Sequence, residues 1–171
     1  MESLGTHFDR ESIGVSPRQG TVPADDSAGN RPEDRIVVGL DGSFGSALAL
    51  RWAAREAAEL GVTLDVVAVW TEADPERPTL DRRPDAPLSV ARERLEHALA
   101  SLVRAPIPPE RIVATPLHGT AGEVLVARAR NARLLVLGTS GIECPTIPGS
   151  TGVYCLRHST APVVFVPAPD A

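Results

Sequence analysis

The chain has 171 residues, of which 43% are hydrophobic and 23% charged, a size and composition that fit one soluble domain with an additional segment. Its net charge is −5 and all 17 basic residues are arginines, which excludes a lysine-containing phosphate loop, a Schiff base and a kinase-type lysine ion pair. No apolar run approaches the roughly 18 residues of a membrane span, and the N-terminal residues lack the apolar core of a secretion signal, so we expect a cytoplasmic protein with no membrane partner.

The first 34 residues differ in composition from the rest of the chain. They hold seven acidic residues and three arginines, are rich in Gly, Pro and Ser, and show no sustained hydrophobic period. Such a segment cannot bury enough apolar area to offset chain entropy, so residues 1–34 are predicted to be a disordered acidic tail. The remainder has fifteen acids and fourteen arginines. This balance argues against a nucleic-acid partner, which would require a clustered basic excess.

After this tail, the sequence predicts a strand, a helix and a second strand. The continuous apolar run at residues 36–40 indicates a strand buried on both faces, which is typical of parallel sheets. Residues 46–60 are rich in Ala and Leu, with charged residues at i, i+4 spacing on the other side, and this pattern predicts a helix that ends at Gly61. The β-rich run at residues 63–70 predicts the next strand.

The second half of the chain continues the alternation of helix and strand. Residues 71–87 are rich in proline, acids and arginine and are predicted to form a long loop. Residues 89–103 are predicted to be a helix with Ser89 as its N-cap, stopped by the prolines that follow. The later predicted elements are a strand at 111–117, a helix at 121–130, a strand at 134–137, a helix at 150–158 and a strand at 163–166.

Strands and helices that alternate at this spacing form right-handed β-α-β crossovers. The predicted fold class is therefore α/β, with three layers: a mainly parallel five-stranded sheet with helices on both faces. Ligands of such sheets bind where loops leave the carboxyl ends of the strands, at the point where the strand order reverses. The candidate ligand-binding loops follow residues 40, 70, 117 and 137.

The loop after the fourth predicted strand is the best candidate for an anion site. It reads GTSGIECPTIPGST from Gly138 to Thr151 and leads directly into a helix. Glycines let the backbone approach a ligand, and the N–H groups at the helix start, with the hydroxyls of Ser150 and Thr151, can hold a phosphate. A loop rich in Gly, Ser and Pro is also a common ordinary turn, so the residues alone leave both interpretations open.

The residues give little support for catalysis or for a metal site. The four histidines, His7, His97, His118 and His158, show no metal-ligand spacing, and Ser140 lacks the G-x-S-x-G context of a nucleophile. No base, arginine finger or carboxylate pair is spaced for phosphoryl transfer, so we expect no enzyme beyond slow incidental nucleotide hydrolysis. Cys144 and Cys155 lack a C-x-x-C spacing, which favours two free thiols in a reducing compartment.

Several motifs together resemble the universal stress protein family. They are the opening IVVGLDGS, the Arg51-Trp52-Ala53 run in the first helix, Gly149-Ser150 before the last helix, and His158 followed by the closing APVVFV. The resemblance covers residues 35–167, and we expect residues 35–168 to form a universal stress protein domain. It implies a Rossmann-like fold of the adenine nucleotide alpha-hydrolase type and, in a subset of members, an ATP site.

The resemblance also implies which residues would form that site. The acid after the first strand, which holds ribose or adenine in the family, matches Asp41, and a backbone group late in the second strand, which meets the base, matches Val69. The phosphate loop of the family, G-x-x-G, nine residues, then G-[ST], matches at its two ends. The implied nucleotide site, which would take ATP with Mg²⁺ accompanying it, consists of Asp41, Val69, Gly138, Gly141, Gly149, Ser150 and Thr151.

Two observations limit this expectation. Seven residues, rather than nine, separate Gly141 from Gly149, and Pro145 and Pro148 lack the N–H groups that could bind phosphate, so ATP binding is expected to be weakened. Asp41 also has a purely structural interpretation, because an acid after a strand often accepts N–H bonds in an Asx-turn.

These observations lead to two functional hypotheses. The first is a stress-response regulator or sensor that binds an adenine nucleotide. The alternative is a nucleotide-free member of the family that acts by homodimerisation through residues 163–166, or by docking a partner. An enzyme of the ATP-pyrophosphatase kind would need Ser-Gly-Gly-x-Asp-Ser after the first strand, and the DGSFGS sequence starting at Asp41 matches that only faintly.

Overall fold

A computed structural model describes residues 34–72, 87–102, 104–139 and 149–168 of the chain. Nearly all of the expected tail and Gly141 of the expected site lie outside these described residues. The described elements, in chain order, are β1 (Arg35–Leu40), α1 (Phe44–Leu60), β2 (Thr63–Trp70), α2 (Leu88–Ser101), the 3-10 turn η3 (Pro109–Arg111), β3 (Ile112–His118), α3 (Ala121–Arg128), β4 (Leu134–Gly138), α4 (Ser150–His158) and β5 (Val163–Val166).

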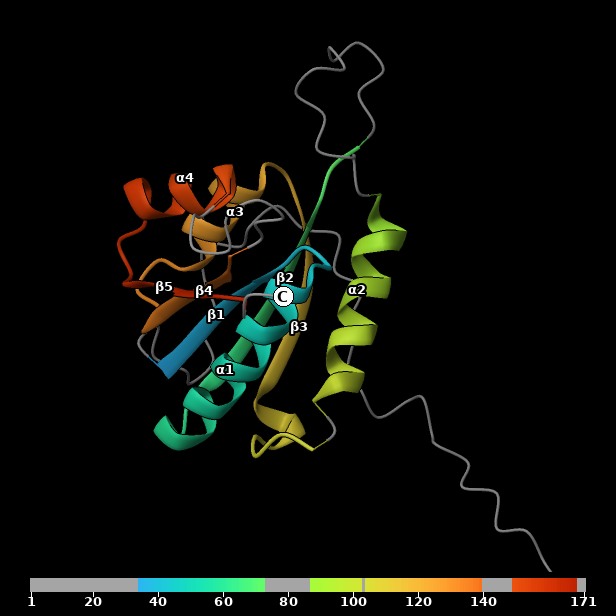
Figure 1. Cartoon of the computed structure of the whole chain (residues 1–171), viewed down its shortest axis with the longest axis vertical. Coiled ribbons are helices and arrows are strands. Elements are labelled where there is room, and N and C mark those ends of the chain that lie inside the picture. The colour runs from blue at the N-terminus through green and yellow to red at the C-terminus, as the bar shows by residue number, and fades with distance from the viewer. Residues whose placement is uncertain (1–33, 73–86, 103, 140–148, 169–171) are drawn as a thin grey trace, which may run out of the picture.

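The strands form one five-stranded sheet in the order β3-β2-β1-β4-β5, and each neighbouring pair is parallel. Helices α1 and α2 cover one face of this sheet, and α3 and α4 cover the other (Figure 1). The predicted three-layer α/β class with a parallel five-stranded sheet is confirmed. The strand order reverses between β1 and β4, where the chain crosses from one helical layer to the other.

Each face of the sheet has its own hydrophobic core, because successive side chains of a strand point to opposite faces. In β1, the fully buried Val38 packs into the core below α1 and α2, and the fully buried Val37 packs into the core below α3 and α4. In β4, Val136 packs into the core below α1 and α2, and Leu135 packs into the core below α3 and α4. This two-sided burial explains why the strand sequences read as unbroken apolar runs.

The first helix begins two residues earlier than the sequence predicted. Ser43 is its N-cap, and the Ser43 side chain accepts a hydrogen bond from the backbone N–H of Ser46 at 3.1 Å. Ser46, predicted as the first helical residue, is instead buried in the first turn, with its hydroxyl donating to the Ser43 carbonyl at 2.9 Å. The helix ends as predicted, at Gly61, whose left-handed φ of 67° completes the cap.

The predicted N-cap of the second helix is wrong. Helix α2 begins at Leu88, its N-cap position is Pro87, and no side chain caps it, so Ser89 lies within the first helical turn. Pro87 holds the extended conformation that an N-cap needs, with φ −60° and ψ 161°. The third helix is also shorter than predicted, because it ends at Arg128 and Asn131 takes a left-handed φ of 59° shortly after.

A charged network joins three elements at the amino-terminal rim of the sheet. Asp65 of β2 is 1% exposed and pairs with Arg128 of α3, with the Arg128 Nε atom 2.7 Å from Asp65 Oδ2. Arg35 of β1 donates from Nη2 to the Arg128 carbonyl at 2.9 Å. Removing one member of such a buried pair typically costs about 3–5 kcal/mol, because the other charge is then left buried and uncompensated. Within the described part of the chain, no helix combines the length and apolarity needed to cross a membrane.

Candidate functional site

The sheet register places three of the expected site residues at one rim. Leu40 of β1 pairs with Ala68 of β2, so Asp41 and Val69 occupy the next level at the carboxyl ends of their strands. Val38 pairs with Val136 of β4, which puts Gly138 level with Leu40 on the other side of β1. The three residues therefore lie on adjacent strands where the strand order reverses, the position at which α/β sheets bind ligands.

Asp41 forms the Asx-turn that its sequence context allowed. Its Oδ1 atom accepts a hydrogen bond from the backbone N–H of Ser43 at 2.9 Å. Desolvation of the carboxylate raises the pKa of Asp41, but hydrogen bonds from Ser43 and Ser46 and the positive charge of Arg94 outweigh this effect and leave the pKa below its ordinary value. The Asp41 carboxylate is therefore charged at neutral pH and has acceptor capacity beyond the Asx-turn.

Asp41 also lines a cavity of about 360 Å³ between the β1–α1 turn and helix α2. The polar groups in its wall include Ser43 and Ser46 from the first turn of α1, and Arg94 and His97 from α2. Arg94 lies directly over the turn, because its Nε atom is 3.0 Å from the place where a Cβ of Gly42 would lie. Gly42 has a φ of 84°, so glycine meets both a steric and a conformational need there.

Sequence reasoning did not include Arg94 or His97 in the site. In the sequence, His97 was considered as a metal ligand, and its spacing gave no support for that role. The two residues lie three positions apart, which places them on the same face of α2. That spacing was visible in the sequence, but nothing in the sequence indicated that this face of α2 lies opposite Asp41.

Gly138 has a packing role that is independent of any ligand. A Cβ on Gly138 would lie 2.2 Å from the carbonyl carbon of Gly45 in the first turn of α1, and a Cβ on Gly45 would lie 2.5 Å from the Thr139 oxygen. The end of β4 and the start of α1 thus touch backbone to backbone. A glycine is required at both positions by this contact alone.

The other described residues of the expected phosphate loop begin helix α4. Gly149 is its N-cap, with an extended ψ of 177°, and its carbonyl accepts the N–H of Val153 at 2.9 Å. Ser150 is exposed and Thr151 is half-buried in the first turn. Helix α4 packs on the face of the sheet opposite the Asp41 cavity, since its Cys155 belongs to the core under α3 and α4. Val69 faces this same core.

His118, His158 and Cys155 lie in structural environments outside the Asp41 cavity. His118 lies against Trp70 with ring centroids 4.4 Å apart, and His158 lies against Tyr154 at 4.3 Å. Burial raises the pKa of Cys155 to about 11, so this thiol is protonated at neutral pH. Over the residues that the structure describes, no group of three or more His, Cys, Asp or Glu side chains could hold a metal ion.

Comparison with known proteins gives matches over most of the chain. The sequence model of the universal stress protein family matches residues 33–167. A universal stress protein of Mycobacterium tuberculosis H37Rv is 32% identical over 133 residues, which cover 77% of this chain and 47% of the relative. The chain therefore spans about half the length of the curated relatives it matches.

Solved structures of universal stress proteins share the fold. One, determined in complex with cAMP, has a TM-score of 0.61 and 23% identity over 80% of this chain and 98% of its own. Another, from Archaeoglobus fulgidus in complex with dAMP, has a TM-score of 0.58 and 24% identity, and covers 79% of this chain and 98% of its own. At these identities, the likeness is one of architecture.

Proposed function

The chain belongs to the universal stress protein family, and from this premise we propose that it binds an adenine nucleotide where β1, β2 and β4 end and acts as a stress-response regulator or sensor. The observation that carries the proposal is the place of the Asp41 cavity, at the reversal of strand order where this fold class binds ligands. Two relatives with the same fold were determined with cAMP and dAMP, which supports an adenine nucleotide as the ligand class.

In the proposed complex, each site residue has a distinct role. The Asp41 carboxylate accepts hydrogen bonds from the ribose hydroxyls or the adenine amine, and the Val69 backbone meets the base. The phosphates lie across the rim, at the glycines and hydroxyls of the β4–α4 connection: Gly138, Gly141, Gly149, Ser150 and Thr151. The proposed nucleotide is ATP with Mg²⁺, held more weakly than in family members with a full-length loop, because this loop is two residues shorter and contains two prolines.

Calorimetric titration of the full chain with ATP and Mg²⁺ tests this proposal, using Asp41→Asn as the diagnostic variant. The asparagine preserves the acceptor of the Asx-turn but removes the charge, so binding is expected to weaken about tenfold or more while the fold is retained. Glu96→Gln, an exposed carboxylate of α2 outside the cavity, is the matched control and is expected to bind as the unmodified chain does. The absence of ATP, AMP and cyclic AMP binding at millimolar concentration would refute the proposal.

An observation on β5 favours a second function, homodimerisation without a nucleotide. The four residues Val163–Val166 are all apolar and only half-buried, and β5 lies at the edge of the described sheet. An apolar edge strand with free N–H and C=O groups is a template for pairing with a second copy.

We further propose a cytoplasmic, non-enzymatic protein whose residues 1–34 form a tail and whose residues 35–168 form the domain.

A further inference from the structure

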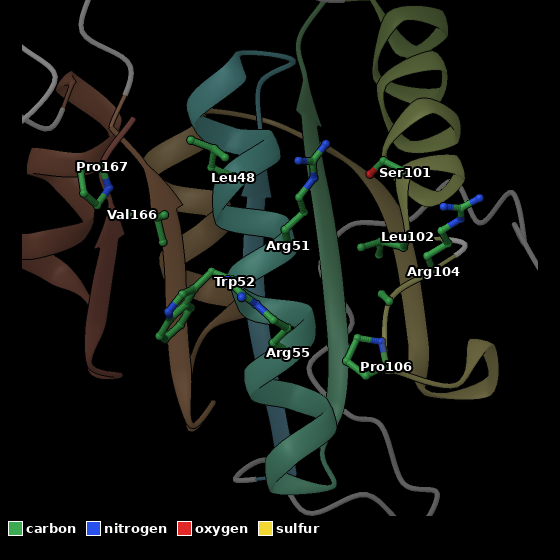
Figure 2. Close-up of a pocket in the computed structure, with 11 residues that line it drawn as sticks. Leu48, Arg51, Trp52, Arg55, Ser101, Leu102, Arg104, Pro106, Val166 and Pro167 are labelled. Atoms are coloured by element: carbon green, nitrogen blue, oxygen red, sulfur yellow. The ribbon is translucent and has the colours of Figure 1, made fainter. Parts of the chain in front are cut away.

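A second, larger hollow lies on the outer side of α1 (Figure 2). It borders the Asp41 cavity, and Ser101 of α2 lines both. It has a volume of about 570 Å³ and extends from α1 to the segment that follows α2 and to the end of β5. Arg51 and Arg55 of α1 and Arg104 after α2 contribute three guanidinium groups. We call this hollow the arginine groove.

The arginine groove combines uncompensated positive charge with an apolar floor. All three arginines are exposed, and none of them takes part in the ion pair found within the described ranges, which joins Arg128 to Asp65. No carboxylate is among the described residues that line it. Trp52 and Leu102 supply apolar surface between the charges. Such a surface suits an extended acidic segment with occasional apolar side chains.

We propose that the arginine groove binds residues 1–33 of the same chain, which belong to the predicted acidic tail. These residues contain six acids and three arginines, and their apolar side chains include Phe8, Ile13 and Val15. The described domain that follows is close to charge balance overall, so the local excess of arginine in the groove has its best complement in this tail. Covalent attachment gives the tail a high effective concentration at the groove, which favours it over a free acidic peptide.

The tail also enters the domain at a suitable place. Arg35 at the start of β1 pairs with Thr63, which follows the end of α1 by only a few residues, so the tail leaves the domain beside the carboxyl-terminal end of α1. Eight residues lie between Asp26 and Arg35, and an extended chain over these nine Cα–Cα steps spans about 30 Å. Helix α1 is about 26 Å long. Asp25 and Asp26 can therefore reach Arg55 and Arg51 along its outer side.

A charge-swap cycle on the full chain tests the proposal. Trp52 lines the groove, and Trp70→Phe leaves it as the sole tryptophan, so acrylamide quenching of its fluorescence reports on coverage of the groove. The four proteins to be compared in this background are the parent, R51E/R55E, D25R/D26R, and the combination of both pairs. We expect either pair alone to increase quenching by about a factor of two, and the combination to return it toward the parent value. About 0.5 M salt should remove the protection in the parent.

A matched control separates docking from a general charge effect. R92E/R133E reverses two exposed arginines outside the groove, and it should neither change quenching alone nor compensate D25R/D26R. Residues 25 and 26 lie outside the described domain, so D25R/D26R does not change the residues that form the fold. This variant therefore still tests the proposal if R51E/R55E fails to fold. Unchanged quenching in D25R/D26R, or strictly additive effects in the combination, would overturn the proposal. Protection that grows with protein concentration would assign the groove to a second copy and would also overturn it.

Discussion

At Gly138, a residue that the sequence linked to phosphate binding is required by the packing of the fold. A Cβ on Gly138 would lie 2.2 Å from the backbone of Gly45, and a Cβ on Gly45 would lie 2.5 Å from the Thr139 oxygen, so no side chain fits at either position. Asp41 gives a similar lesson, because its carboxylate completes a turn and also lines a cavity. A residue that matches a ligand-binding motif at such a position can be required by the fold, by the ligand, or by both. Only a variant that changes one of these two roles can separate them.

Gly138→Ala is therefore expected to destabilise the domain even without nucleotide. Forcing a methyl group against the Gly45 backbone should lower the free energy of unfolding by about 2–3 kcal/mol, a typical cost of overpacking. Urea denaturation followed by circular dichroism measures this cost. Ala100→Ser, an exposed change on α2, serves as the control and should stay within about 0.5 kcal/mol of the parent. Equal stability of Gly138→Ala and the parent would contradict the backbone contact.

At the scale of the elements, strands were easier to predict than helix starts. The strand at residues 63–70 was predicted at its observed bounds, because a strand buried on both faces must be apolar at almost every position. Helix starts depend on one or two capping residues, and several serines compete for that role in the sequence. Ser43 caps α1, whereas Ser89 lies inside the first turn of α2 and does not cap it. In α2 the N-cap position is taken by Pro87, two residues before Ser89, and the sequence alone does not fix that start.

Paired serine substitutions test this assignment of the caps. Ser43→Ala removes the hydroxyl that accepts the Ser46 N–H, so the free energy of unfolding should fall by about 1 kcal/mol. Ser89→Ala removes no capping bond and replaces an exposed helical serine with a better helix former, so stability should be unchanged or slightly higher. Thermal unfolding of the two variants beside the parent gives the comparison. A larger loss at Ser89 than at Ser43 would restore the cap predicted from the sequence.

For the whole molecule, the sheet separates the candidate site into two halves. The Asp41 cavity belongs to the side of α1 and α2, whereas Gly149 to Thr151 begin the helix on the opposite side. The sequence predicted that these residues meet at one rim, because the carboxyl ends of parallel strands share an edge. It did not predict the contribution of α2, since the face that a helix presents to a distant loop depends on packing across the sheet. Arg94 and His97 are visible as candidates only in three dimensions.

The proposed dimer depends on the free edge of β5, and proline scanning can test it. The N–H groups of Leu135 and Thr139 donate to the carbonyls of Pro162 and Val166, so in the alternating ladder the Val163 N–H points away from β4. Val163→Pro should remove a donor needed for pairing with a second copy while keeping the ladder to β4. Sedimentation velocity should then show a monomer, while Val163→Ala, the control for the lost side chain, should remain dimeric. A dimer of undiminished strength in Val163→Pro would exclude pairing through this edge.

The linkage of Arg35, Asp65 and Arg128 has a practical consequence for protein engineering. It ties β1, β2 and α3 together at the rim farthest from the connections that form the candidate site. Diversity can therefore be introduced into those connections without disturbing the charged bonds that hold the scaffold. Libraries with randomised connections would keep the contacts among Arg35, Asp65 and Arg128 at the opposite rim, which makes this domain a suitable framework for grafted recognition loops.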